Sequence, residues 1–135
     1  MTPAPGVRIG HVALWTDDIG RLAQFYAKYL GADVGSLYAN PAKGFESRFL
    51  TFAGGARLKL MRTSTLRPAR YERGAQRMGL THIAISLGAE GRVDELTRLL
   101  REDGFAVLDG PRRTGDGYYE SVVLDPDGNR IELTV

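Results

Sequence analysis

The chain has 135 residues, of which 43% are apolar and 25% charged, and its formal net charge is +2. This composition is typical of one globular domain with a hydrophobic core, and it argues against disordered and fibrous proteins. The absence of cysteine excludes a disulfide scaffold, a thiolate zinc site and a cysteine nucleophile. Because no signal-peptide pattern and no apolar run of about 18 residues is present, we expect a cytoplasmic protein outside membranes.

The first half predicts one helix among four strands, near residues 7–15, 33–38, 46–53 and 56–62. The helix follows the first strand, because apolar side chains recur there at helical spacing: Leu22, Phe25, Tyr26, Tyr29 and Leu30. Gly31 then ends it as a C-terminal cap. The "AGG" turn at residues 53–55 joins the last two strands as a hairpin.

An arginine-rich segment from Arg62 to Arg77 follows, and it predicts a linker over residues 64–78. A basic run can track phosphates. This one contains a proline and a glycine and lacks a helical or base-stacking pattern, so we predict no nucleic-acid partner. We interpret it as a solvated linker that helps to hold an anionic ligand or a partner chain.

The second half repeats the plan, with strands near residues 80–87, 105–108, 118–124 and 130–135. Its helix is predicted by Val93, Leu96, Leu99 and Leu100, and Gly104 ends it. The histidines of the two opening strands lie 71 residues apart, at positions 11 and 82, and Lys59 and Glu132 of the closing strands lie 73 apart. We therefore predict a single α+β domain, 1–135, of two tandem βαβββ modules near residues 7–63 and 79–135.

Alternation of side chains along a strand assigns each position to one face of its sheet. One face is aliphatic and is expected to pack on the helices: Val12, Leu14, Leu58, Leu60, Ile83, Ile85, Ile131 and Leu133. The other face is polar and holds the matched residues with their neighbours: His11, Trp15, Arg57, Lys59, Met61, His82, Arg130 and Glu132. Glu46 and Glu120, from the similar triplets "FES" and "YES", are candidate supporting groups.

The polar face contains both histidines of the chain. Such a face can simply be wetted by solvent. Clustering two imidazoles and a carboxylate is nevertheless costly unless they bind a ligand or one another. Two histidines and one carboxylate also form a facial ligand set for a divalent metal, so we predict His11, His82 and Glu132 as metal ligands.

The paired modules, the two strands that open with His, a β-branched residue and Ala, and the closing "DPDGNRIEL" resemble the vicinal oxygen chelate superfamily. This superfamily includes glyoxalase I, bleomycin-resistance proteins and extradiol dioxygenases. The resemblance implies a cup-shaped mixed sheet with helices on its outer face and a divalent zinc, nickel, manganese or iron(II) ion near its floor. Carried over, the ligand positions fall on His11, Lys59, His82 and Glu132.

Lys59 departs from this pattern, because glyoxalase I and many relatives have glutamate there. A protonated lysine has no acceptor for a metal. Three outcomes stay open. The other three residues hold the metal while Lys59 binds an anionic substrate group or acts as a base; Lys59 and Glu132 pair without metal; or activity has been lost.

The resemblance implies a glyoxalase I-like, lactoylglutathione lyase-like enzyme that acts on a small oxygenated metabolite chelated by the metal, with Glu132 as base and Lys59 at the position of its partner. The alternatives are a metal-free binding protein similar to bleomycin-resistance proteins and a three-ligand iron(II) dioxygenase. Trp15, Arg57, Met61 and Arg130 are candidate substrate contacts; packing competes with this role for Trp15 and Met61, and turn stabilisation for the two arginines. The resemblance and the open sheet edges also imply a homodimer.

Overall fold

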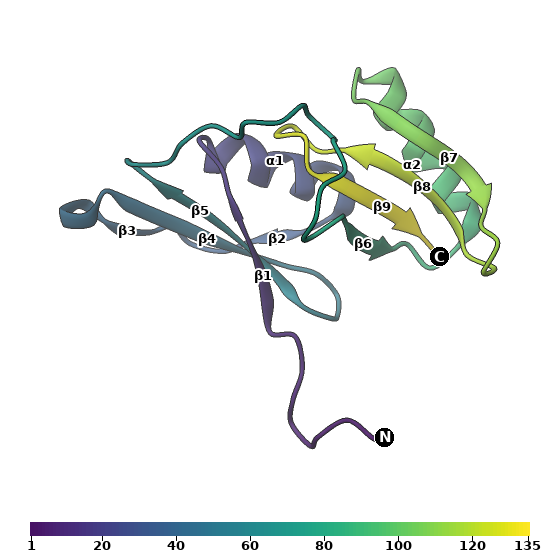
Figure 1. The fold of residues 1–135 in the computed structure, drawn as a ribbon, viewed down its shortest axis with the longest axis horizontal. Helices are drawn as coiled ribbons and strands as arrows, with labels where there is room; N and C mark the ends of the chain where they lie inside the picture. The colour runs from purple at the N-terminus through teal and green to yellow at the C-terminus, as the bar shows by residue number, and fades with distance from the viewer. The chain divides into compact units, whose positions relative to one another are not determined.

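The computed structural model describes all 135 residues, which form two compact units, Met1–Pro68 and Ala69–Val135 (Figure 1). The boundary between the units falls inside the predicted linker. Each unit contains one α-helix and one sheet that mixes parallel and antiparallel pairs. The predicted α+β class with two tandem modules is therefore confirmed.

Unit 1 contains one α-helix, one short 3₁₀ helix and five strands. In chain order they are β1 (His11–Trp15), α1 (Ile19–Leu30), β2 (Asp33–Val34), β3 (Tyr38–Asn40), η1 (Pro41–Lys43), β4 (Phe45–Thr51) and β5 (Arg57–Thr63). The sheet order is β1-β5-β4-β2, and β3 pairs with β4 as well. β1 runs parallel to β5, whereas β4 and β5 form the predicted antiparallel hairpin.

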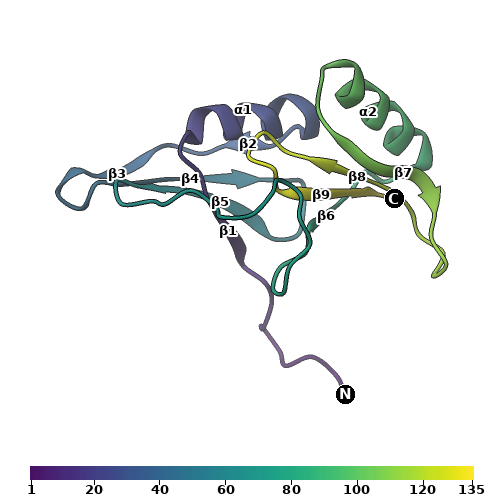
Figure 2. The same ribbon diagram turned by 45° about the horizontal axis from the view of Figure 1, so that its top comes forward.

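Helix α1 ends where its sequence predicts, and it begins after an aspartate cap. The Asp18 side chain accepts a hydrogen bond from the backbone N–H of Arg21 at 2.9 Å, which caps the first turn. Gly31 has a left-handed backbone with φ 66°, and it closes the C-terminus. The helix lies along one side of its own sheet (Figure 2), where Leu22, Leu58 and Leu60 are buried. Burial of each such leucine contributes about 2–3 kcal/mol to folding.

Unit 2 contains four strands and one α-helix. Its elements are β6 (Ile83–Ser86), α2 (Glu90–Glu102), β7 (Val107–Arg113), β8 (Tyr119–Leu124) and β9 (Arg130–Thr134). The sheet order is β6-β9-β8-β7, with β6 parallel to β9. Between α2 and β8, the buried hydroxyls of Thr97 and Ser121 are 2.7 Å apart and share a hydrogen bond. The aliphatic face predicted for this module is buried at Ile131 and Leu133.

The turn between β8 and β9 is held together by Asp125, whose side chain is fully buried. One carboxylate oxygen accepts from the backbone N–H groups of Asp127 and Asn129, at 2.9 and 3.0 Å. The other accepts from the Asn129 side-chain amide at 2.9 Å. Gly128 adopts φ 85°, a conformation in which glycine is favoured. The "DPDGN" motif therefore forms a turn in which the Asp125 carboxylate is hydrogen-bonded by the turn itself.

The C-terminal part of the predicted linker packs onto unit 2 and is not merely solvated. Arg73 donates to the carbonyl of Pro126 at 3.0 Å, and Arg130 donates to the carbonyl of Gly74 at 2.9 Å. A Cβ placed on Gly74 would meet the Leu124 side chain at 3.1 Å. These contacts tie residues 73–74 to the β8–β9 turn.

Four predicted strands have clearly different bounds in the structure, and one of them, predicted over 80–87, is shortened to Ile83–Ser86. Residues 7–10 precede β1 without joining it, because their only link to β5 is the bond from the Arg57 N–H to the Gly10 carbonyl. The strand predicted over 33–38 divides into β2 and β3. The strand predicted over 105–108 continues to Arg113, with register shifts before and after Asp109. Neither helix is long and apolar enough to cross a bilayer.

Candidate active site

Strand pairing confirms that the two modules place matched residues at equivalent points. In unit 1 Ala13 of β1 lies opposite Lys59 of β5, and in unit 2 Ala84 of β6 lies opposite Glu132 of β9. On the other side of each closing strand, Lys59 faces Phe49 and Glu132 faces Val122. Lys59 and Glu132 are therefore structural equivalents within their own units.

Unit 2 brings His82 and Glu132 together. His82 directly precedes β6, and its Nε2 lies 3.1 Å from Oε2 of Glu132. The side chains are 33% and 16% exposed, so the pair is sheltered and still reachable from solvent. An imidazole nitrogen and a carboxylate at this separation form one hydrogen-bonded unit on the polar face.

Glu120 on β8 joins this pair. It lies opposite Thr134 of β9, on the same face as Glu132. Hydrogen bonding to Glu132, followed by burial and the negative charge of that neighbour, raises the pKa of Glu120 to about 7. Arg112 and His82 oppose this rise through their positive charge. The face therefore holds one carboxyl group, that of Glu120, which loses its proton near neutral pH.

Unit 1 gathers its matched residues around the ring of Phe49 instead. The Arg57 guanidinium lies 3.9 Å from the ring centroid, and Nζ of Lys59 lies 5.5 Å from it. The His11 ring meets Phe49 edge-on, with centroids 5.4 Å apart. Three of the residues predicted from the sequence thus form one cationic and aromatic cluster.

The remaining predicted contacts occupy different environments. Trp15 lies opposite Met61 on β5, and it is 52% exposed. Arg130 uses its guanidinium to hold the Gly74 carbonyl, which is a bond within unit 2. Trp15 and Met61 therefore share the polar face of unit 1 with Lys59. Arg130 instead holds the linker residue Gly74 through a hydrogen bond.

Comparison with known proteins identifies the family. A family model of the Glyoxalase/Bleomycin resistance protein/Dioxygenase superfamily matches residues 8–133. The chain belongs to this superfamily. The match spans both units, and the resemblance predicted from the sequence is confirmed.

Individual relatives of the superfamily show the same fold. Glyoxalase I of Leishmania major superposes with a TM-score of 0.72 at 24% identity, over 95% of this chain and 86% of that one. A glyoxylase/bleomycin resistance protein/dioxygenase domain from Frankia gives 0.79 at 17% identity, over 96% and 97%. The uncharacterized protein YqjT of Bacillus subtilis is 37% identical over 60 residues, which cover 42% of this chain and 47% of that protein. The matched segment thus spans about half of YqjT.

The superfamily typically uses a divalent metal, and the donors of unit 2 fit one. Two ligands of one ion lie about 3 Å apart when each bond is about 2.0–2.2 Å long, which agrees with the 3.1 Å between His82 and Glu132. Neither unit alone gathers three His, Asp or Glu side chains able to hold a metal ion. His11 belongs to unit 1, so the ligand set predicted from the sequence is divided between the units.

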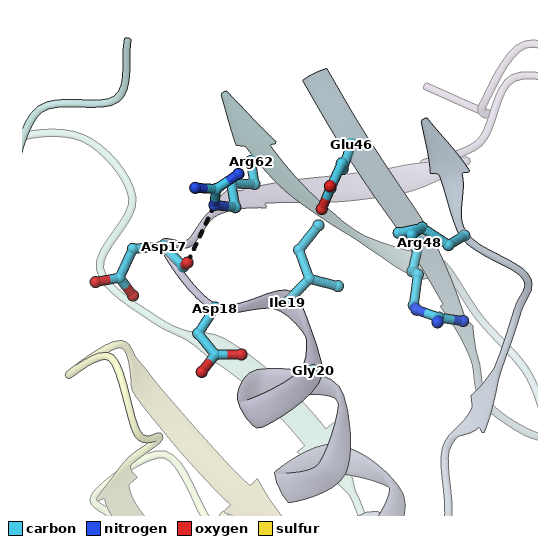
Figure 3. Close-up of a pocket in the computed structure, with 8 residues that line it drawn as sticks. Asp17, Asp18, Ile19, Gly20, Glu46, Arg48 and Arg62 are labelled. Carbon is cyan, nitrogen blue, oxygen red and sulfur yellow. Dashed lines mark hydrogen bonds between the residues drawn. The ribbon is translucent and has the colours of Figure 1, made fainter. Parts of the chain in front are cut away.

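A cavity of about 380 Å³ lies on the helix side of unit 1, away from its polar face (Figure 3). Glu46 points into it from β4, which corrects its expected place beside the polar-face residues. The "FES" and "YES" triplets are offset by one residue, so Glu46 and Glu120 lie on opposite types of face. Arg48 and Arg62 each donate to a backbone carbonyl, of Gly35 and of Asp17. The arginines therefore have structural roles there.

Proposed function

We propose that this chain is a glyoxalase I-like, metal-dependent enzyme of the lyase or isomerase type that acts on a small oxygenated metabolite. The observation that carries the proposal is the 3.1 Å contact between His82 and Glu132 at the expected metal position, with Glu120 beside it. Membership of the superfamily supports it. The sequence repeat nominates His11 as the third ligand.

A divalent metal held by His11, His82 and Glu132 would supply Lewis-acid polarisation of two vicinal substrate oxygens. The chemistry left to the protein is the movement of a proton between adjacent carbons. Glu132 is the proposed base that takes this proton and returns it to the neighbouring carbon. Glu120 shares a hydrogen bond with Glu132, and its pKa of about 7 lets it hold a proton on this face near neutral pH.

Metal stoichiometry tests the proposal. Purified protein is stripped with a chelator and incubated separately with zinc, nickel, manganese and iron(II), and bound metal is then measured by mass spectrometry. We expect about one equivalent of one of these metals per chain, and a loss of about tenfold or more in affinity on His82→Ala. Glu95→Gln, on the exposed side of α2, is the matched control and should leave binding unchanged.

Bound metal below about a tenth of an equivalent for all four ions would refute the metal-dependent enzyme. The chain would then be a metal-free binding protein. We also propose a homodimer in the cytoplasm that binds a small-molecule substrate. Because β1 and β6 are the outer strands of their sheets, they offer edges for pairing, and light scattering on the eluting protein reports the assembly.

A further inference from the structure

The cluster around Phe49 has the composition of an anion-binding surface. Arg57 and Lys59 are neighbours on one face of β5, both lie over the same aromatic ring, and His11 closes its edge. Neither cation takes part in an ion pair or a side-chain hydrogen bond. Two positive charges are therefore presented together without a counter-charge from unit 1.

Unit 1 has few carboxylates with which to neutralise this cluster. It contains nine lysine and arginine residues but only four acidic ones. Asp17 and Asp18 precede α1, and Glu46 points into the cavity on the helix side. Asp33 lies on β2, which is separated from β5 by β4. Within unit 1, therefore, no carboxylate lies beside Arg57 and Lys59 to balance their charge.

The ring of Phe49 prepares Arg57 for such a ligand. A guanidinium held over an aromatic face is stabilised by the ring and keeps N–H donors available for an anion. Less side-chain entropy is then lost when an anion binds, because one conformation is already favoured. Lys59 adds a second donor on the same face of the same strand.

The repeat also shows how the charge of unit 1 differs from that of unit 2 at equivalent positions. Lys59 occupies the point in unit 1 that Glu132 occupies in unit 2, so equivalent positions carry opposite charges. We infer that the polar face of unit 1 binds an oxyanion, a carboxylate or a phosphate, through Arg57 and Lys59 braced on Phe49. The inference rests on the proposed function in one respect, since it makes the substrate an anionic metabolite.

Trp15 provides the assay, because it is the single tryptophan of the chain and is exposed on the same face. Its fluorescence is followed while chelator-treated protein is titrated with inorganic phosphate and, separately, with malonate at constant ionic strength. Side-chain ¹⁵N spectra follow the Arg57 Nε–H in parallel. We expect saturable changes with at least one anion, and the comparison of the two anions separates phosphate from carboxylate recognition.

Charge-removing variants locate the site. Lys59→Gln and Arg57→Gln should each weaken binding by about tenfold, as expected for the loss of a charge-assisted hydrogen bond. Lys59→Arg keeps the charge and should bind within about threefold of the unchanged protein. Lys43→Gln and Arg8→Gln remove exposed charges elsewhere in unit 1 and are the matched controls. Circular dichroism confirms that each variant is folded.

The inference is overturned if neither anion produces a saturable change, or if the two glutamine variants at positions 57 and 59 bind as tightly as the controls. Should Lys59→Gln unfold the chain, Arg57→Gln and Lys59→Arg still decide the outcome. Metal content is measured separately. Anion binding without metal would refute only the proposed enzyme, whereas metal binding without anion binding would refute only this inference.

Discussion

Replacement of Glu120 by glutamine should make the metal-free protein less sensitive to alkaline pH. The pKa of Glu120 is raised from 4.5 to about 7, so the folded protein holds a proton there that the unfolded chain releases. Below about pH 4.5 this carboxyl is protonated in both the folded and the unfolded state, so it does not lower stability. As the pH rises from there through 7, the unfolded chain releases the proton more readily than the folded protein, and stability is lost. Glutamine cannot ionise, so it removes this loss.

The size of the effect follows from the same contact. A shift from 4.5 to about 7 corresponds to at most about 3 kcal/mol. Solvent reaches this face and Glu132 shares the proton, so the expected gain for Glu120→Gln at pH 8 is about 1–2 kcal/mol. For a chain of 135 residues, that gain raises the melting temperature by about 3–8 °C. At pH 5 the difference should be small.

Thermal melts followed by circular dichroism at pH 5, 6, 7 and 8, with chelator present, measure this difference. Glu95→Gln removes a carboxyl from the exposed face of α2 and should show no such pH dependence. A shift in melting temperature of equal size at pH 5 and pH 8 would show that Glu120 is not held protonated by Glu132. Destabilisation by Glu120→Gln at pH 8 would refute the reasoning outright.

Substitutions at three further positions test other parts of the structure. Asp125→Ala removes the acceptor of the β8–β9 turn and leaves partly buried N–H groups unpaired, so it should cost about 2–4 kcal/mol in a urea melt, and Asp125→Asn should cost less. Gly110→Ala places a Cβ 2.6 Å from a backbone carbonyl oxygen of β8 at φ 79°, and it should cost at least about 2 kcal/mol; a neutral result would mean that β7 can shift. Lys59→Glu should strengthen zinc or nickel binding by about tenfold in calorimetry, since it adds a ligand and removes a positive charge. Unchanged affinity would place Lys59 outside the metal site.

Much of the fold follows from the sequence, because the repeat and the two-residue alternation of strands are both visible in it. Alternation assigned Leu58 and Ile131 to buried faces and Lys59 and Glu132 to polar ones, as the structure has them. The prediction ended this strand at residue 108 and missed its extension to Arg113, because glycine and proline, here Gly110 and Pro111, usually interrupt a strand. Their place on the outer strand β7 makes a missing N–H tolerable there.

Tertiary placement explains what the sequence could not reveal about the site. The "FES" and "YES" triplets match with a one-residue slip that is visible in the sequence, and the strand register shows that this slip places Glu46 and Glu120 on opposite types of face. The raised pKa of Glu120 depends on a neighbour in another strand, which no local pattern records. The position of Arg57 and Lys59 over the Phe49 ring likewise depends on contacts between residues of different strands.

The "DPDGN" turn also bears on how members of this superfamily are sorted. Both carboxylate oxygens of Asp125 accept hydrogen bonds from its own turn, so this stretch of the family motif has a structural role. Selection for a well-formed corner would preserve it whatever reaction the polar face performs. Residues 59, 120 and 132 lie on the polar faces instead, and they are the positions to compare when the activities of such chains are to be told apart.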